Sequence, residues 1–368
     1  MEAVGLVVRV DPVGNLVGRR AGADDSLPPV ATGSHVDTVV EGGKYDGALG
    51  VLGALETIRL LNEAGIRTRN PLEVIVFTGE EQGGFHAGAK GSRAMVGKLT
   101  SDHLRRWRDD QGCTFWEALQ AAGYQPERLP EAVRQPGSLH CFVELHIEQG
   151  RVLEEAGARL GVVTAIAGLT TAQVEIHGRA DHAGATPTGL RHDALAAAAE
   201  VVLAVERLAR QEAGRGTVGT VGELRALPGF PATIPGLVQL WLDTRGVDDA
   251  SKQSVLDGTA AALAEACRSR GLAGERELLV DERALPMTAD VIAGLRAACE
   301  EVGVSPLLLP SGAGHDARHM AALGPVGMLF VPSAGGVSHA PDEYTTPEDL
   351  CLGVQALAHA LVRLAGRA

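Results

Sequence analysis

Residues 28–65 read P-P-V-A-T-G-S-H-V-D-T-V-V-E-G-G-K-Y-D-G-A-L-G-V-L-G-A-L-E-T-I-R-L-L-N-E-A-G, and this stretch decides the fold. Its short apolar run ends at His35, and an amphipathic helix is expected from Ala48 to the glycine that closes the stretch. The run L-E-V-I-V-F-T at 72–78 predicts a strand, and residues 139–145 predict another. Strands that alternate with helices in this way indicate an α/β domain with a mostly parallel sheet.

The composition is that of a globular protein large enough for two moderate domains, with 368 residues, 45% of them hydrophobic. Its net charge of −13 argues against a nucleic-acid partner and against binding to anionic membranes. No apolar stretch approaches the length of a membrane span, and no signal-peptide pattern is visible. The five cysteines are scattered without a C-x-x-C pair. We therefore expect a cytoplasmic protein without nucleic-acid or membrane partners.

The middle of the chain follows a different pattern from its two ends. Residues 168–284 alternate predicted strands and helices in the order βαββαβ, which is typical of a ferredoxin-like α+β sandwich. The residues after this block return to the α/β pattern of the beginning. We therefore expect one α/β domain made of residues 1–167 and 285–368, with a second domain inserted between them.

Five separated segments place histidine, aspartate or glutamate just after an apolar strand or at a helix start. In open α/β sheets, ligands bind beyond the carboxyl ends of the strands, so these side chains can converge there. Taken singly, a histidine at a strand end is more often structural, and a glutamate pair is usually solvated. Their shared position favours a common site. The segments are G-S-H-V-D-T (33–38), K-Y-D-G (44–47), F-T-G-E-E (77–81), E-L-H-I-E-Q-G (144–150) and G-V-S-H-A-P-D-E (336–343).

Histidines and carboxylates without cysteine are the ligand set of a divalent metal such as Zn, Mn, Co or Ni. Two adjacent metals need a shared ligand, and Asp46 is the natural candidate for a bridging carboxylate. In the pair Glu80-Glu81, one carboxylate can bind metal while the other acts as a general base on water. Asp37 can hold the other ring nitrogen of His35.

Essentially the whole chain resembles the N-carbamoyl-L-amino-acid hydrolase and allantoate amidohydrolase family, within the aminoacylase-like dinuclear metallopeptidase superfamily. The resemblance rests on the five segments above and on G-S-R-A-M, G-V-V-T-A-I-A-G, D-H-A-G-A-T-P, L-D-T-R and S-G-A-G-H-D-A. It implies a metallopeptidase-like catalytic domain and an inserted domain that serves in dimerisation and as a lid. It also implies cleavage of the carbamoyl C–N bond of N-carbamoyl-L-amino acids or ureido acids such as allantoate, with release of ammonia and CO2.

The resemblance also implies a role for each matching residue. Two divalent metal ions would be held by five ligands, with the aspartate as the bridge: His35, Asp46, Glu81, His146 and His339. Glu80 matches the catalytic base, and Asp37 matches the residue that orients the first histidine. The substrate contacts are Gln149 at the ureido group, Arg245 at the carboxylate, and the backbone of Gly312, Ala313 and Gly314. His182 matches a histidine that stabilises the oxyanion in the partner subunit's active site, which implies a homodimer.

The sequence departs from the family pattern in two places. The asparagine that usually precedes I-P-G, and that contributes to carboxylate recognition, is Ala232 here, and alanine cannot donate a hydrogen bond. Family members also carry a further helix or two before the position of Met1.

Two other functions stay open, and one further motif needs an assignment. An aminoacylase or dipeptidase would use the same metal site. A non-catalytic metal-dependent binding protein is the third possibility, which the retained Glu80 disfavours. For the pair His315-Asp316 we expect a role in local structure or in supporting the metal ligands, since the metal site already supplies base and electrophile.

Overall fold

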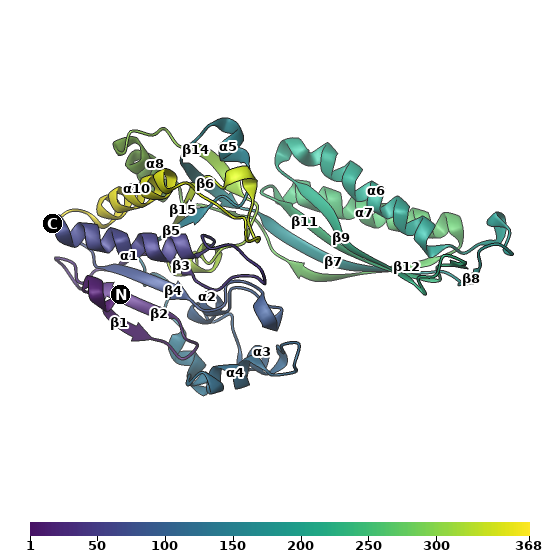
Figure 1. Cartoon of the computed structure of the whole chain (residues 1–368), viewed down its shortest axis with the longest axis horizontal. Coiled ribbons are helices and arrows are strands. Elements are labelled where there is room, and N and C mark those ends of the chain that lie inside the picture. Colours follow the sequence, from purple (N-terminus) through teal and green to yellow (C-terminus); the bar gives the residue numbers. More distant parts are fainter. The chain divides into compact units, whose positions relative to one another are not determined.

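A computed structural model describes residues 1–368, which form two compact units. The first unit consists of Met1–Thr164 and Met287–Ala368, and the second is Ala165–Pro286 (Figure 1). None of the helices combines the length and the apolar character that a membrane crossing requires. Short 3-10 helices occur at Glu2–Val4, Gly83–Phe85, Pro126–Ala132, Thr188–Leu190, Ala213–Arg215 and Ala334–Gly336.

A nine-stranded sheet forms the centre of the first unit, in the order β1-β2-β4-β3-β5-β15-β6-β13, with β14 paired to β6. Its strands β6 and β13 carry the chain between the two units. The strands are β1 (Val7–Val10), β2 (Leu16–Arg20), β3 (Val30–His35), β4 (Leu72–Phe77), β5 (Cys141–Ile147), β6 (Gly161–Ile166), β13 (Leu285–Pro286), β14 (Leu307–Ser311) and β15 (Val326–Val331).

The sheet is mixed, so the expectation of a mostly parallel sheet holds only for its centre. There β3 pairs in parallel with β4 and β5, and β15 pairs in parallel with β5. Toward one edge, β1 and β2 form an antiparallel hairpin that joins β4, and β15 pairs antiparallel with β6 toward the other. The hairpin has no clear signal in the sequence, because β1 is short and mostly exposed and its V-V-R-V lacks apolar alternation.

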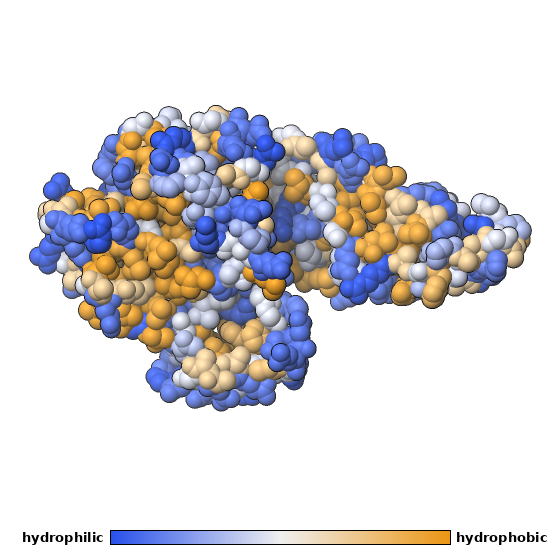
Figure 2. All heavy atoms as spheres, viewed as in Figure 1, coloured by the Kyte–Doolittle hydropathy of each residue, from blue (hydrophilic) through white to orange (hydrophobic).

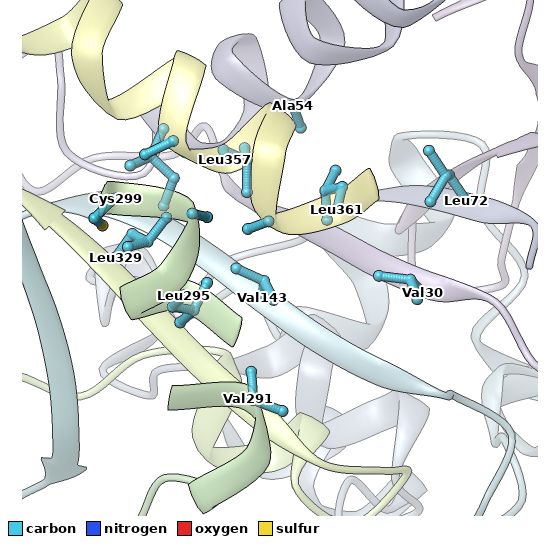
Figure 3. Packing of buried hydrophobic residues seen from close by; sticks show 14 of the residues in the cluster. Val30, Ala54, Leu72, Val143, Val291, Leu295, Cys299, Leu329, Leu357 and Leu361 are labelled. Carbon is cyan, nitrogen blue, oxygen red and sulfur yellow. The ribbon is translucent and has the colours of Figure 1, made fainter. Parts of the chain in front are cut away.

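The main core lies where α1 (Ala48–Glu63), α8 (Ala289–Glu301) and α10 (Pro347–Ala365) pack together and against the central strands. Figure 3 shows side chains of α8 and α10, among them Leu295 and Leu361, packed beside Val143 of β5. Leu361 is fully buried, so its replacement by alanine is expected to cost about 2–5 kcal/mol. Neighbouring residues of a strand point to opposite faces. Since Val143 and Leu145 belong to this core, Glu144 and His146 point to the other face.

Shorter helices complete the first unit: α2 (Lys90–Met95), α3 (Ser101–Arg106), α4 (Phe115–Ala121), α5 (Val152–Ala156) and α9 (Ala317–Met320). Leu104 and Phe115 belong to a smaller apolar cluster between α3 and α4. The helix α9 contacts β5 and β15, and α2 contacts β4.

In the second unit, an antiparallel four-stranded sheet in the order β12-β7-β11-β9 packs against two helices. Apart from the two-residue strands β8 and β10, which pair with each other, its elements follow the predicted order βαββαβ. Asp193 and Asp248 cap the two helices by accepting hydrogen bonds from backbone N–H groups. The elements are β7 (Gly168–His177), β8 (Asp181–His182), α6 (Ala194–Glu212), β9 (Val218–Leu227), β10 (Thr233–Ile234), β11 (Leu237–Gly246), α7 (Asp249–Arg270) and β12 (Ala273–Asp281).

Several apolar side chains stay at the surface of the second unit, among charged ones (Figure 2). Leu203 on α6 is 64% exposed. Val218, Leu224 and Leu227 are exposed on β9, which is an edge strand of the sheet.

Candidate active site

Four parallel strands bring the candidate residues to one edge of the sheet. His35 is the last residue of β3, and His146 is next to last in β5. Glu80 and Glu81 follow β4, and His339 lies in the segment after β15. Because β4, β3, β5 and β15 run in the same direction, their carboxyl ends meet at this edge, as the sequence predicts.

Asp46 lies at the centre of the cluster, with its side chain only 3% exposed. Its Oδ1 is 3.1 Å from His146 Nε2 and 3.6 Å from His35 Nε2. Its Oδ2 is 3.2 Å from His339 Nε2, and that nitrogen is also 3.2 Å from Glu81 Oε1. The five predicted ligands therefore fall into two groups that share Asp46: one with the first two histidines, the other with Glu81 and His339. Within each group the ligand atoms lie within 4.8 Å of one another, close enough to hold one metal ion.

The two buried histidines are oriented with their Nε2 atoms toward the cluster. The Nδ1 of His35 is 2.9 Å from the Asp37 carbonyl oxygen, and the Nδ1 of His146 is 2.9 Å from the Ile147 carbonyl oxygen. In a neutral ring whose Nδ1–H donates to the carbonyl, Nε2 carries the lone pair that binds a cation. Imidazole nitrogens and carboxylate oxygens suit the borderline divalent metals, so the donor set fits such ions.

The charges of the cluster stabilise one another. Burial raises the pKa of Asp46, but the hydrogen bond and charge of His146, together with the charges of His35 and His339, lower it well below its usual range. Burial lowers the pKa of His146, while Asp46 raises it to about 9. Asp46 is thus an ionised carboxylate held among positive charge, as expected of a side chain that binds cations.

Asp37 holds both the histidine and the glutamate pair. Its main-chain carbonyl contacts His35, as given above, and its carboxylate lies 3.7 Å from the same nitrogen. The carboxylate oxygens accept hydrogen bonds from the backbone N–H groups of Glu80 and Glu81, at 3.2 and 3.1 Å. The predicted contact with His35 is therefore made mainly by the main chain, while the carboxylate fixes the segment that carries the two glutamates.

Glu80 stands beside the two ligand groups without belonging to either. Its Oε2 is 3.9 Å from His35 Nε2. Burial raises the pKa of Glu80 well above its usual value, and the nearby carboxylates of Glu81, Glu144 and Asp37 raise it further. A carboxylate whose pKa is raised is a stronger base than an ordinary one, which suits a group that accepts and returns a proton.

Gln149 and His339 hold unusual backbone conformations, with φ of 62° and 55°. Non-glycine residues in this region carry strain that persists only where the surroundings hold it, often at functional sites. The Gln149 Nε2 donates to Asp46 Oδ2 at 2.8 Å, and its Oε1 is buried without a hydrogen-bond partner. Gln149 therefore touches the cluster and has one acceptor left for a ligand.

Glu343, in the same segment as His339, supports the helix start that carries Asp46. Its Oε1 accepts the backbone N–H groups of Tyr45 and Asp46, at 2.9 and 3.0 Å. Its Oε2 accepts the hydroxyl of Ser338 at 2.7 Å.

The segment of Gly312, Ala313 and Gly314 follows β14 and leads to His315. The His315 imidazole is 2.8 Å from Ser311 Oγ, and its ring packs edge-on against His146 with 4.6 Å between ring centroids. His315 therefore packs against the imidazole ring of His146 and helps to hold it in place.

Glu144 and Lys90 are buried site neighbours to which the sequence analysis gave no role. The carboxylate of Glu144 accepts the Ser34 hydroxyl at 2.7 Å and the Ala317 backbone N–H at 3.0 Å. A charged residue inside the apolar strand C-F-V-E-L-H-I, two positions before His146, was the available signal for Glu144. For Lys90 there was none, because the small residues around it, A-G-A-K-G-S at 87–92, resemble an ordinary loop.

The remaining candidates belong to the second unit. His182, in β8, is exposed, and its Nδ1 accepts the backbone N–H groups of Gly184 and Ala185 at 3.0 and 3.1 Å. Arg245, in β11, donates from Nε and Nη2 to the two carboxylate oxygens of Asp243, at 2.9 and 3.0 Å. The carbonyl of Ala232 accepts the Ala183 N–H at 2.9 Å, so the position of the missing asparagine adjoins the His182 segment.

The chain is similar to known proteins along almost its whole length. An N-carbamoyl-L-amino acid amidohydrolase of Geobacillus stearothermophilus is 44% identical over 371 residues, covering 99% of this chain and 88% of the relative. The allantoate amidohydrolase of Bacillus subtilis (strain 168) is 36% identical over 366 residues, again covering 99% and 88%. The crystal structure of an amidase of the hydantoinase/carbamoylase family from Burkholderia multivorans superposes with a TM-score of 0.91 at 36% identity, covering 100% of this chain and 88% of that one.

These relatives confirm the resemblance inferred from the sequence motifs. The model of peptidase family M20/M25/M40 matches residues 25–363, which include every candidate residue of both units. The chain therefore belongs to peptidase family M20/M25/M40.

Proposed function

We propose that this protein is a metal-dependent amidohydrolase that cleaves the carbamoyl C–N bond of N-carbamoyl-L-amino acids or related ureido acids such as allantoate, releasing ammonia and CO2. The observation that carries the proposal is the pair of ligand groups that share Asp46, with Glu80 beside them. The names of the two relatives described above, an N-carbamoyl-L-amino acid amidohydrolase and an allantoate amidohydrolase, support this substrate class.

Two divalent ions, of Zn, Mn, Co or Ni, fit the two groups. His35, Asp46 and His146 would hold one ion, and Asp46, Glu81 and His339 would hold the other. When bound, such ions polarise a carbonyl oxygen and make water more acidic.

In the reaction, Glu80 takes a proton from water while the water oxygen forms a bond to the ureido carbon. The bond from that carbon to the amino-acid nitrogen then breaks, and Glu80 returns the proton to the departing nitrogen. The products are the free amine and carbamic acid, and the latter decomposes into ammonia and CO2. His182 stabilises the negative oxygen that develops in between, a contribution that is often large in amide hydrolysis.

Three groups are assigned to substrate recognition. Gln149 contacts the ureido group through its unpaired amide oxygen. Arg245 binds the substrate carboxylate, for which the planar fork of a guanidinium is suited. The backbone of residues 312–314 lines the pocket.

We further infer that the second unit is a ferredoxin-like lid and dimerisation domain. The element order βαββαβ and the antiparallel sheet with β12 and β9 at its edges support this assignment. The exposed apolar side chains of β9 are consistent with an edge that meets another subunit. In such a homodimer, His182 acts in the active site of the partner. The five free cysteines favour a reducing compartment such as the cytoplasm.

A substrate panel tests the proposed activity. Metal-stripped protein is reconstituted with Mn, Co, Ni or Zn, and ammonia release is measured from N-carbamoyl-L-amino acids and allantoate. Amine release is measured in parallel from N-acetyl amino acids and dipeptides. We expect turnover of the carbamoyl or ureido substrates. Turnover of only the N-acyl compounds or dipeptides would replace the proposal with an aminoacylase or dipeptidase, and metal binding without any turnover would indicate a binding protein.

A further inference from the structure

We propose that Lys90 is a positioning residue for the cation held by Asp46, Glu81 and His339. Its ammonium group fixes the main chain of residues 79–82, and this fixes the direction of the Glu81 side chain. The inference rests on the proposed function in so far as it requires a cation at this group.

The ammonium of Lys90 is directed at the carbonyls of the glutamate segment. Lys90 begins α2 and is 3% exposed. Its Nζ is 3.0 Å from the carbonyl oxygen of Glu81, 3.4 Å from that of Gln82 and 3.5 Å from that of Gly79. These contacts are all to main-chain oxygens, so Lys90 acts on the backbone of the segment.

Both peptide groups next to the Glu81 Cα are held by charged side chains. On one side, its N–H donates to Asp37 Oδ2 at 3.1 Å. On the other side, its carbonyl accepts from Lys90 Nζ. Fixing both peptide planes sets the backbone dihedral angles of Glu81 and therefore the direction of its Cα–Cβ bond. The carboxylate that emerges lies 3.2 Å from His339 Nε2.

The cost of burying the ammonium supports a positional role. An ammonium taken out of water loses much of its solvation free energy, and this loss is large unless its partners compensate for it. An apolar side chain of similar length would avoid this cost, but it could not hold the Glu81 carbonyl. The backbone bonds from Ala89 and Lys90 hold the carbonyls of Glu80 and Gly79, which leaves Glu81 to the ammonium.

The inference predicts that loss of the Lys90 ammonium affects the two cation sites differently. Glu81 belongs to one ligand group only, while His35 and His146 come from the ends of β3 and β5. Loss of the ammonium should therefore lower the cation affinity of the site that contains Glu81. The affinity of the site that contains His35 and His146 should stay unchanged.

Cobalt binding to Lys90→Met tests this prediction. Metal-free protein is titrated with Co²⁺ and followed by calorimetry and by the visible absorption of the ion. We expect the wild type to bind two Co²⁺ ions. Lys90→Met should keep one site at unchanged affinity and bind the second ion about 10- to 100-fold more weakly, as is typical when the support of a metal ligand is removed. Glu81→Gln provides the reference spectrum for a protein that lacks the second site.

Lys252 offers a matched control. It is also 3% exposed, and its Nζ also donates to a main-chain carbonyl, that of Glu282 at 2.6 Å, but it lies in the second unit. Lys252→Met should bind both ions as the wild type does. Folding of every variant is checked by circular dichroism, and Lys90→Leu, whose side chain also has no donor, replaces Lys90→Met if the latter is unfolded.

The outcomes separate this inference from the proposed function. Two sites of wild-type affinity in a folded Lys90 variant would overturn the role of Lys90, and so would equal weakening of both sites. A wild type that binds fewer than two Co²⁺ ions would instead overturn the metal centre itself.

Discussion

The two units hold their candidate functional residues in opposite ways. In the first unit, His35, Asp46 and His146 are 2%, 6% and 1% exposed, and their polar atoms have partners inside the cluster. In the second unit, His182 is exposed, and the Arg245 side chain is 36% exposed. The three central ligands are therefore buried and preset, with only His339 of the five exposed, at 48% of its side chain, while the two residues of the second unit are presented at a surface.

This difference corresponds to two chemical tasks. Donors that hold cations and move protons work best when they are fixed before the substrate arrives, because reorganisation during the reaction would raise the barrier. Residues that grip a substrate and then release the product must be reachable, and lid elements commonly supply them. The comparison predicts that changes in the first unit abolish proton transfer or metal binding, whereas changes in the second unit alter how the substrate and its developing oxyanion are held and which subunit is served.

The largest effect is expected for Glu80→Gln. The amide keeps the shape of the side chain but cannot take a proton from water, so kcat for ammonia release should fall about 10³-fold. Because Glu80 lies outside both ligand groups, two Co²⁺ ions should still bind. A variant that keeps both metals and full activity would remove Glu80 from the mechanism.

Mixing two inactive variants tests the role of the second unit, namely whether His182 acts in the active site of the partner subunit. His182→Ala and Glu80→Gln proteins should each be nearly inactive. If His182 serves the partner subunit, a mixed dimer has one complete active site. That site combines Glu80 of the His182→Ala subunit with His182 of the Glu80→Gln subunit. After unfolding and refolding of an equal mixture, about a quarter of the wild-type activity should return, because half of the dimers are mixed and each has one complete site. No recovery, despite mixed dimers shown by native mass spectrometry, would mean that His182 acts within its own chain or not at all.

Much of the first unit could be predicted from the sequence because its signals are local. Apolar strands that end in His35 or His146, and the pair Glu80-Glu81 just after a strand, place the side chains at one sheet edge without knowledge of distances. The antiparallel hairpin of β1 and β2 was not predicted, because four mostly exposed residues carry no periodic signal.

What the sequence did not reveal depends on contacts between distant segments. Nothing in A-K-G-S distinguishes a buried lysine from the far commoner exposed one, yet Lys90 is buried against the carbonyl of Glu81. The carboxylate of Asp37 was expected to serve His35, but its hydrogen bonds to Glu80 and Glu81 span more than forty residues of sequence. Such contacts follow from the packing of β3 beside β4 and not from any local pattern.

The folding stability of the first unit should also decrease in mild acid, because this unit contains the buried His319. Burial and the charges of Lys98, Arg93 and Arg318 lower the pKa of His319 to about 3, and the residue is 7% exposed. In the unfolded chain a histidine takes up a proton near pH 6.5. His319 therefore supports the folded state fully above that pH, and its contribution is lost as the pH falls toward 3.

For His319→Gln, denaturant unfolding at pH 7 and pH 5 measures this effect. The wild type should lose about 2 kcal/mol more stability between these two pH values than the variant does. The same pH dependence in both proteins would show that His319 is not the group responsible.

The smallest effect is expected where the second unit departs from its family. Ala232 adjoins the His182 segment through the bond from the Ala183 N–H, and alanine has no side-chain donor. In Ala232→Asn, an added amide donor to the substrate carboxylate should lower KM for an N-carbamoyl amino acid about tenfold, the typical worth of a hydrogen bond to a charged group. Because the change lies in the unit that holds the substrate, kcat and Co²⁺ binding should stay as in the wild type. Ala232→Ser, whose hydroxyl is shorter, should have a smaller effect on KM. A change in kcat with constant KM would place position 232 in the chemical step and so erase the division of labour between the two units.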